Sequence, residues 1–415
     1  MSIEPDVAGA NPQSLKRRTR TFWPILPLVP HKILHLDLDA FFCAVEEGRD
    51  PSLRGVAFAV GGRPEERGVV SSCSYAARKF GVHSALPMSR AVKLCPGLII
   101  VRSRHHVYEE VSEKVMTLLR NTTPLVEQIS IDEAFLDVSD MPEPGETLAR
   151  QLQAAIRDEL SLPASLGMAS NKLVAKIATD VGKAASRTGD YPNAVLAVPP
   201  GEEATFLAPL PTRALWGVGP KTAERLKAMG IGTIGDIARW PEADLARRFG
   251  KLGHELSGHA RGLDDRPVVT SRDTKSISQE ITFARDIAEG KQLRKTLREL
   301  SEQVGRRLRA SGLAGATIRL KLRWPDFTTL SRQITLPQPT DQDDEIAEAV
   351  MRLFDAEWKP GRPVRLLGVA AAGLGPLSQQ LNLWDGDSEK RRRLQSVVDE
   401  LRDRFGDDVM KRGSG

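Results

Sequence analysis

Three observations predict a multidomain α+β protein. The 415 residues are too many for one hydrophobic core and correspond to about three domains of ~150 residues each. Hydrophobic residues make up 40% and charged residues 27% of the chain, which excludes fibrous, collagen-like and wholly disordered proteins. Strand patterns alternate with amphipathic helices in the first half, and a second strand-rich unit follows a glycine-rich helical stretch.

The first half predicts a sheet covered by helices. Ile33–Leu38 predicts a buried strand with leucines on one face, and with Asp37 and Asp39 sharing the other. A segment bending around Asp132 and Glu133 predicts a strand pair. Two amphipathic helices are expected to flank this pair, with apolar faces Val107, Val111, Val115, Leu118 and Leu148, Leu152, Ile156, Leu160. A strand at Ala164–Met168 and a helix at Asn171–Val181 follow.

The second half predicts two further units. From about Gly201 to Pro267 the pattern is one of short helices separated by glycines, and Gly262–Thr270 predicts a linker. The elements expected next are strand Lys275–Phe283, helix Lys291–Ala310, strands Thr317–Arg323 and Thr328–Leu336, helix Asp344–Glu357 and strand Val364–Ala371. This βαββαβ order predicts one open four-stranded sheet with two helices on one face.

Compartment and targeting signals point to the cytoplasm. No apolar run approaches the ~20 residues of a membrane span, and Phe22–Pro30 contains three prolines. Cys43, Cys73 and Cys95 form no CxxC pair, so neither a disulfide framework nor a zinc cluster is indicated. The polar, basic stretch before about Pro30 is expected to be a flexible extension.

Charge is unevenly distributed along the chain. The net charge is only +5, but Thr270–Pro337 holds fourteen Lys and Arg against seven Asp and Glu, whereas the tail after Trp384 is balanced. This segment predicts a surface that faces nucleic-acid phosphates. A solvated basic helix would give the same composition, so both interpretations stay open here.

Four carboxylates lie at strand ends. Asp37 and Asp39 come from the first strand, and Asp132 and Glu133 from the bend of the strand pair. Each alone is explained as a strand-end carboxylate in water. Together they offer oxygen ligands from two places on one sheet, the kind that Mg²⁺ prefers while substrate phosphates complete its coordination. Two such ions can activate an attacking hydroxyl and neutralise a leaving pyrophosphate.

A cationic helix end could hold those phosphates. Tyr75, Arg78 and Lys79 fall within one helical turn before Gly81, and Tyr75 and Arg78 face the same way. A solvated helix end is the alternative. Lys172, Lys176 and Lys183, on and just after another predicted helix, offer further cations.

Three segments resemble the signatures of a known family. They are His35-Leu-Asp-Leu-Asp-Ala-Phe-Phe42, Ser71-Ser-Cys-Ser-Tyr-Ala-Ala-Arg-Lys-Phe-Gly-Val82 and Ser130-Ile-Asp-Glu-Ala-Phe-Leu-Asp137. They resemble the Y-family translesion DNA polymerases, in particular the DNA polymerase IV (DinB) branch. The resemblance extends in order from about Lys32 to Trp384.

The resemblance implies a right-hand polymerase with palm, fingers, helix–hairpin–helix thumb and βαββαβ little finger. The implied limits are 1–31 for an N-terminal extension, 32–48 and 105–198 for the palm, 49–104 for the fingers, 199–266 for the thumb, 267–273 for a linker, 274–375 for the little finger and 376–415 for a C-terminal tail.

It also implies site residues. Asp37, Asp132 and Glu133 would be catalytic and would bind two Mg²⁺ ions together with the carbonyl of Leu38. Tyr75, Arg78 and Lys183 would contact the triphosphate. Phe41 and Phe42 would adjoin the nucleotide, with Phe42 as the steric gate against a ribose 2′-hydroxyl. Core packing is the other explanation for Phe42; in an extended chain the two rings would point oppositely.

Two further segments suggest macromolecular partners. Leu215–Met229 resembles a helix–hairpin–helix, in which Gly217, Gly219 and Lys221 would approach DNA phosphates. Arg319, Lys321 and Arg323 would add contacts from the last domain. Gln380-Leu-Asn-Leu-Trp384 resembles the peptide that binds a β-type sliding clamp, anchored by Gln380, Leu381, Leu383 and Trp384. A simple helical turn and a plain tail are the respective alternatives.

The expected function is therefore template-directed, low-fidelity addition of deoxynucleotides to a primer 3′-hydroxyl during translesion synthesis. The chain would act as a monomer on primer–template DNA and dNTPs, with no membrane and no proofreading domain. A catalytically silent DNA- and clamp-binding paralogue is the runner-up, although such a scaffold would not need the three carboxylates and Phe42. A palm-fold nucleotide cyclase would leave the helix–hairpin–helix unexplained.

Overall fold

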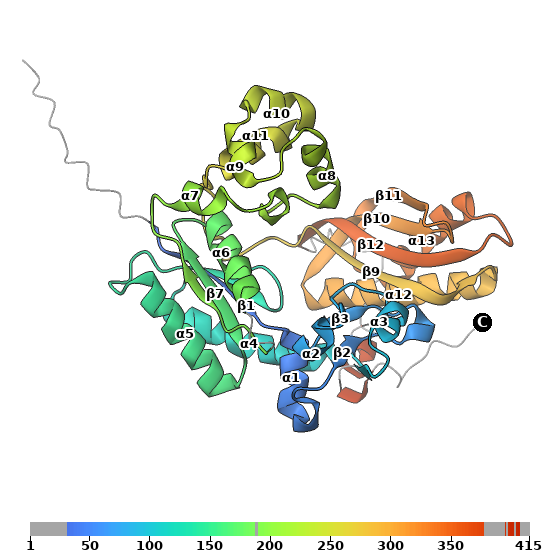
Figure 1. Cartoon of the computed structure of the whole chain (residues 1–415). Coiled ribbons are helices and arrows are strands. Elements are labelled where there is room, and N and C mark those ends of the chain that lie inside the picture. Colours follow the sequence, from blue (N-terminus) through green and yellow to red (C-terminus); the bar gives the residue numbers. More distant parts are fainter. Residues whose placement is uncertain (1–30, 187–189, 377–394, 396, 402–403, 407–415) are drawn as a thin grey trace, which may run out of the picture.

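The structure is a computed structural model that describes residues 31–186, 190–376, 395, 397–401 and 404–406. The predicted N-terminal extension before His31 and the predicted clamp peptide Gln380–Trp384 lie outside the described residues. Figure 1 shows the chain as four units, each built on its own sheet or helix cluster. No helix among the described residues combines the length and the apolar character needed to traverse a bilayer.

The first unit is a five-stranded sheet. In order across the sheet its strands are β5 (Val126–Gln128), β6 (Glu133–Asp137), β1 (Ile33–Leu38), β7 (Ala164–Ala169) and β8 (Val195–Ala197). Only β7 and β8 run parallel. Strand β1 is central and almost wholly buried because helices cover both of its faces.

Helices α4 (His105–Thr122) and α5 (Gly145–Leu160) cover the leucine face of β1, and α6 (Lys172–Ala185) covers the other face. The predicted register of the first helix is wrong by about one position. Tyr108, Ser112, Val115, Met116 and Leu119 are buried, whereas Val107, Val111 and Leu118 are only partly so. Periodicity missed this because Ser112 points inward to donate to the carbonyl of Ile131 at 2.6 Å.

The second unit joins the first through α1 (Phe41–Arg49). It is a small sheet of β3 (Val70–Cys73), β2 (Phe58–Gly61) and β4 (Ile99–Val101), with α2 (Tyr75–Arg78) and α3 (Met88–Leu94) beside it. All three cysteines are free and buried.

The third unit is helical, as the glycine spacing predicts. Its helices are α7 (Glu203–Leu207), α8 (Pro220–Ala228), α9 (Ile234–Arg239), α10 (Glu242–Phe249) and α11 (Lys251–His259). Their buried residues form one core with α6, so this unit stands on the α6 face of the first sheet (Figure 1).

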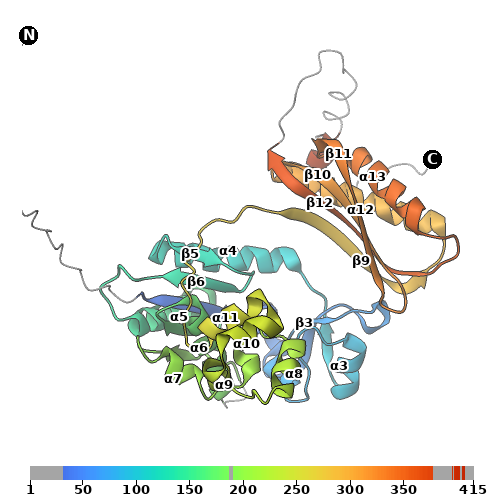
Figure 2. The ribbon, with the colours of Figure 1, turned by 90° about the horizontal axis from the view of Figure 1, so that it is seen from above.

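The fourth unit confirms the predicted βαββαβ order. Its elements are β9 (Ser276–Ile287), α12 (Gly290–Ala310), β10 (Leu313–Arg323), β11 (Thr329–Thr340), α13 (Asp343–Glu357) and β12 (Val364–Pro376). The antiparallel sheet has the order β11-β10-β12-β9, and both helices pack on one face of it (Figure 2). The far end of β9 touches the second unit, where Arg67 Nη1 lies 2.6 Å from Asp286 Oδ1.

The segment predicted as a linker is bound to the first sheet at two of its residues. The buried carboxylate of Glu127, on β5, accepts hydrogen bonds from Lys172 Nζ at 2.8 Å and from the backbone N–H of Val269 at 2.9 Å. Arg272 also pairs with it. Although burial opposes ionisation, these donors lower the pKa of Glu127. Polar composition did not predict this contact, because the partner carboxylate lies 142 residues earlier in the sequence.

Candidate active site

The three predicted catalytic carboxylates lie on two adjacent strands and in the bend that precedes one of them. Asp37 stands directly opposite Glu133 in the β1–β6 pairing, and the N–H of Leu38 donates to the carbonyl of Asp132 at 3.0 Å. Ser130 fixes the bend, because its hydroxyl donates to Asp132 Oδ1 at 2.5 Å and accepts from the N–H groups of Asp132 and Glu133. The bend predicted from sequence is confirmed, and it brings the three carboxylates to one place.

This arrangement concentrates negative charge. Burial raises the pKa of Asp132, and the neighbouring carboxylate of Asp37 raises it further. Burial likewise raises the pKa of Glu133; Lys176 opposes this shift, whereas Asp37 and Asp132 add to it. The site therefore favours an added cation, since a cation would relieve both burial and repulsion.

Two lysines of α6 supply positive charge in this structure. Lys176 Nζ lies 2.8 Å from Glu133 Oε1, and Lys183 Nζ lies 2.6 Å from Asp37 Oδ1 and 3.1 Å from Asp39 Oδ1. Although burial alone would lower the pKa of Lys183, the two aspartates raise it. Lys183 was expected just after a helix; it lies within α6, which continues to Ala185. Lys172 instead forms a buried ion pair with Glu127.

Asp39 lies on the same side as Asp37, as expected, because both carboxylates contact Lys183, but Asp39 is also bound within the fold. Strand β1 ends at Leu38, and the chain turns through Ala40 in a left-handed conformation with φ of 45°. The side chain of Asp39 is fully buried and accepts from Ser165 Oγ at 2.8 Å and from the N–H of Asn193 at 3.1 Å. It is a positioning carboxylate that holds Lys183.

The two adjacent phenylalanines are helical rather than extended. They open α1, so they point in different directions by helical rotation and not by strand alternation. Phe41 is 2% exposed and belongs to the core, whereas Phe42 is only partly buried. The Phe42 ring stacks on Tyr108 with centroids 4.1 Å apart and an interplanar angle of 14°.

The contacts that hold Tyr108 against the Phe42 ring were not predicted from the sequence. The hydroxyl of Tyr108 donates to Glu46 Oε1 at 2.6 Å, and Arg104 Nη1 lies 3.3 Å from Glu46 Oε2. A tyrosine one position from the predicted apolar face of its helix was the only signal available.

Tyr75 and Arg78 lie on α2, as predicted, and Arg78 stacks over the Tyr75 ring at 4.5 Å. Ser74 caps the helix by accepting from the N–H of Ala77 at 3.2 Å. Burial, with the negative charge of Asp39, raises the pKa of Tyr75 to about 12, so its hydroxyl remains a donor.

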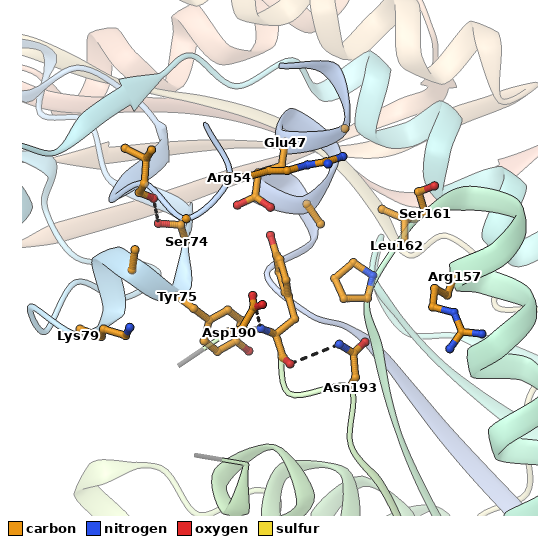
Figure 3. A pocket seen from close by; sticks show the side chains of 17 residues that line it. Glu47, Arg54, Ser74, Tyr75, Lys79, Arg157, Ser161, Leu162, Asp190 and Asn193 are labelled. Carbon is orange, nitrogen blue, oxygen red and sulfur yellow. Dashed lines mark hydrogen bonds between the residues drawn. The ribbon is translucent and has the colours of Figure 1, made fainter. Parts of the chain in front are cut away.

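A cavity of about 640 Å³ adjoins Tyr75 (Figure 3). Charged side chains of both signs line it: Glu47, Arg54, Lys79, Arg157 and Asp190. Tyr191, also in its wall, meets the Tyr75 ring edge-on at 5.4 Å and thereby restricts it. This contact was not predicted, because Tyr191, in the segment between α6 and β8, lies far from Tyr75 in the sequence.

Comparisons with known proteins identify this arrangement. A family model described as the impB/mucB/samB family matches residues 36–180, its C-terminal domain matches 274–383, and an IMS family HHH motif matches 200–231. DNA polymerase IV of Streptomyces coelicolor is 44% identical over 354 residues, covering 84% of this chain and 72% of that protein. DNA polymerase IV of Desulfatibacillum aliphaticivorans is 41% identical over 381 residues, covering 90% and 94%. This chain belongs to the Y-family DNA polymerases, in their DNA polymerase IV branch.

A solved structure agrees with this family. A Y-family DNA polymerase chimera, Dbh-Dpo4(243-245)-Dbh, has a TM-score of 0.73 and 25% sequence identity, covering 83% of this chain and 99% of that one. The chain is accordingly a DNA-directed DNA polymerase of translesion synthesis, acting on DNA and dNTPs. The silent-paralogue alternative is not favoured.

The family implies a divalent metal cofactor, and the residues present fit one. Among the described residues no three His, Cys, Asp or Glu side chains are already gathered as in a preformed cation site. The donor chemistry nevertheless suits a hard cation, because Asp132 and Glu133 are carboxylates whose pKa values are raised by burial and by neighbouring negative charge.

The residues expected to bind DNA lie at two exposed places. Gly217 and Gly219 precede α8, and Gly217 has a φ of 92°, which favours glycine. A Cβ added at either glycine would meet no atom within 4 Å, so a large ligand can approach. Arg319, Lys321 and Arg323 alternate with buried residues on β10 and therefore lie on the sheet face without helices.

Proposed function

We propose that Asp37, Asp132 and Glu133 are the catalytic carboxylates of this polymerase and hold two Mg²⁺ ions, with the carbonyl of Leu38 as a further ligand. When bound, the ions would activate the primer 3′-hydroxyl and neutralise the leaving pyrophosphate. The three carboxylates would hold the ions in position, and the hydrogen bond from Ser130 keeps Asp132 in place. The observation that carries the proposal is the register of Asp37 opposite Glu133. Template-directed primer extension that stops when divalent metal is chelated tests it.

The nucleotide would lie between the side chains that contact its triphosphate and the phenylalanines that adjoin its sugar. Tyr75 and Arg78 would donate to the triphosphate from α2, and Lys183 would reach it from α6. Lys183 must then leave Asp37, and an incoming divalent ion would compensate that carboxylate in its place. Phe41 and Phe42 would adjoin the sugar, with Phe42 as the steric gate.

On this proposal the four units correspond to the palm, fingers, thumb and little finger that the family resemblance implies. Residues 32–48 and 105–198 would be the palm, 49–104 the fingers, 199–266 the thumb and 274–375 the little finger. The segment 267–273 would connect the last two, although it is bound to Glu127 over part of its length.

DNA would be gripped through its phosphates by Gly217, Gly219 and Lys221 of the thumb and by the β10 row of the little finger. Within that row Lys321 Nζ lies 2.6 Å from Glu280, which offsets its charge. Among the described residues, Arg319 and Arg323 bond to the uncharged side chains of Gln333 and Thr329. The two arginines would therefore carry most of the attraction.

Replacing both Arg319 and Arg323 by alanine should weaken duplex binding and reduce its salt dependence. Each lost phosphate contact lowers the slope of log K against log salt by about 0.9, so the slope should fall by about 2. Anisotropy titrations at several salt concentrations, with two unrelated duplexes, measure the slope and its lack of sequence preference. Alanines at Lys295 and Arg298, which are exposed on α12, are the matched control. An equal loss from that pair would mean that the basic helix, and not the sheet, faces DNA.

Clamp binding rests on the sequence alone, through Gln380, Leu381, Leu383 and Trp384. We infer a sliding clamp of the β type as partner, with the polymerase a monomer in the cytoplasm. Strand β12 ends at Pro376, four residues before this peptide begins.

Deleting Gln380–Trp384 should leave synthesis on a short primer unchanged and abolish stimulation by a loaded clamp. Tethering raises the local concentration of polymerase at the primer end without adding catalytic contacts. Product length with and without clamp and loader measures the effect, and a double alanine change at Leu383 and Trp384 should reproduce it. Undiminished stimulation of the deletion variant would place the clamp contact elsewhere.

A further inference from the structure

A groove lies between α4 and α5, on the sheet face opposite the catalytic carboxylates. Its volume is about 900 Å³. Leu34 and Leu36 of β1 pack in the same core as these two helices, whereas Asp37 projects to the α6 side. The groove is therefore separated from the active site by the whole thickness of the sheet.

The groove has an apolar floor and an acidic rim. Leu118, Met141 and Leu160 are partly buried in it, and Leu148 and Leu152 form its base. The acids that line it are Glu110, Glu113, Glu143 and Glu159, and the only lysine or arginine in its described lining is Lys114. Glu113 is already paired with Arg120, which leaves the other three to attract a cation.

One of these acids has a buried oxygen without a partner. Among the described residues, Glu143 Oε2 is shielded from solvent and accepts no hydrogen bond. A shielded carboxylate oxygen without a donor costs free energy. Glu143 also lines the groove, so its negative charge adds to that of the rim. This points to an occupant with positive charge.

The chain enters the fold beside this groove. Lys32, just before β1, donates from Nζ to the carbonyl of Glu143 at 3.1 Å and also bonds the carbonyl of Met141. The described part of the chain therefore begins close to the groove wall. Ten residues span at most about 33–36 Å when extended, so a segment that precedes His31 is long enough to follow the groove from this point.

The preceding segment has the complementary composition. Residues 14–30 hold four cations, Lys16, Arg17, Arg18 and Arg20, and no carboxylate side chain. Phe22, Trp23, Ile25, Leu26 and Leu28 follow them directly. Apolar side chains next to a basic run match an apolar floor next to an acidic rim.

We propose that the groove between α4 and α5 binds the chain's own residues 14–30, with Phe22 and Trp23 on the apolar floor and the basic run against Glu110, Glu143 and Glu159. The contact is intramolecular, so its effective concentration is high and modest affinity suffices to keep the groove covered. The N-terminal segment thereby becomes part of the back surface of the palm.

Thiol labelling of the full-length protein tests this proposal without relying on polymerase activity. A T117C variant places a reporter thiol in the groove wall, and the three native cysteines are buried and therefore slow to react. Adding F22A and W23A to T117C should speed labelling of the reporter about tenfold or more. High salt should also speed it, because it screens the rim. An E109C reporter, exposed on α4 but outside the groove lining, should label at the same rate with or without the phenylalanine and tryptophan.

Reversing the charges of the rim and of the basic run tests whether the two attract each other, as opposed to nonspecific shielding of the groove. Reversing Glu159 to lysine together with Glu143→Gln should expose the reporter, and reversing Lys16 and Arg17 to glutamate in that background should restore part of the protection. Equal labelling of T117C with and without Phe22 and Trp23 would overturn the proposal. Protection that grows with protein concentration would overturn it too, since it would identify a second copy as the occupant.

Discussion

Asparagine at position 132 should lower the rate of primer extension by about a thousandfold or more while primer–template affinity stays nearly unchanged. Loss of one metal-holding carboxylate removes stabilisation of the transition state, and three decades correspond to about 4 kcal/mol. DNA affinity should persist because the proposed DNA contacts lie on other units. Single-turnover extension with Mg²⁺ and a matched dNTP measures the rate, and anisotropy measures DNA binding.

The same substitution should not destabilise the protein. Asp132 is partly buried near Asp37, so removing its charge relieves repulsion, and asparagine can still accept the hydrogen bond from Ser130. The melting temperature should therefore stay equal or rise. Asp180→Asn is the matched control. The negative charge of Asp37 acts on this exposed carboxylate of α6 as well, but Asp180 has no proposed ligand role. A folded D132N protein with near-normal turnover would refute the metal assignment.

Alanine at position 42 should admit ribonucleotides. Removing the ring frees the space of a 2′-hydroxyl, and a clash of about 3–4 kcal/mol corresponds to two to three decades of discrimination. The ratio of kcat/KM for a dNTP to that for the matching rNTP, opposite one template base, measures the change. Selectivity should fall mainly because the rNTP becomes a better substrate.

Tyr108→Phe is the control for the gate, because it retains the ring that stacks on Phe42 and removes only the hydroxyl that bonds Glu46. Its sugar selectivity should change little. If F42A leaves the ratio within about twofold, Phe42 is a packing residue and another side chain excludes the ribose.

Local patterns predicted the sheets well, because hydrophobic alternation reports directly on burial. The βαββαβ unit was predicted element by element. Asp37 on β1 and the strand bend were likewise predicted. Their exact register, Asp37 opposite Glu133, required the structure.

Contacts between distant segments could not be predicted. Tyr191 and Asn193 lie more than 110 residues from the groups they position, Tyr75 and Asp39, and nothing in the intervening sequence fixes that approach. The helix that begins at Phe41 was missed for a local reason. Its preceding turn uses a left-handed alanine, and propensity gives that conformation to glycine or asparagine instead.

The attachment of Val269 and Arg272 to the first sheet limits how the last unit can move. Arg272 and Val269 are fixed at Glu127, and β9 starts at Ser276, so only about three residues, or some 10 Å of chain, act as a leash. Arg67 holds the other end of β9 through Asp286. Release of that ion pair would let the four-stranded unit swing about the leash as a pivot. The short connection would still hold the start of β9 close to the first sheet in every orientation.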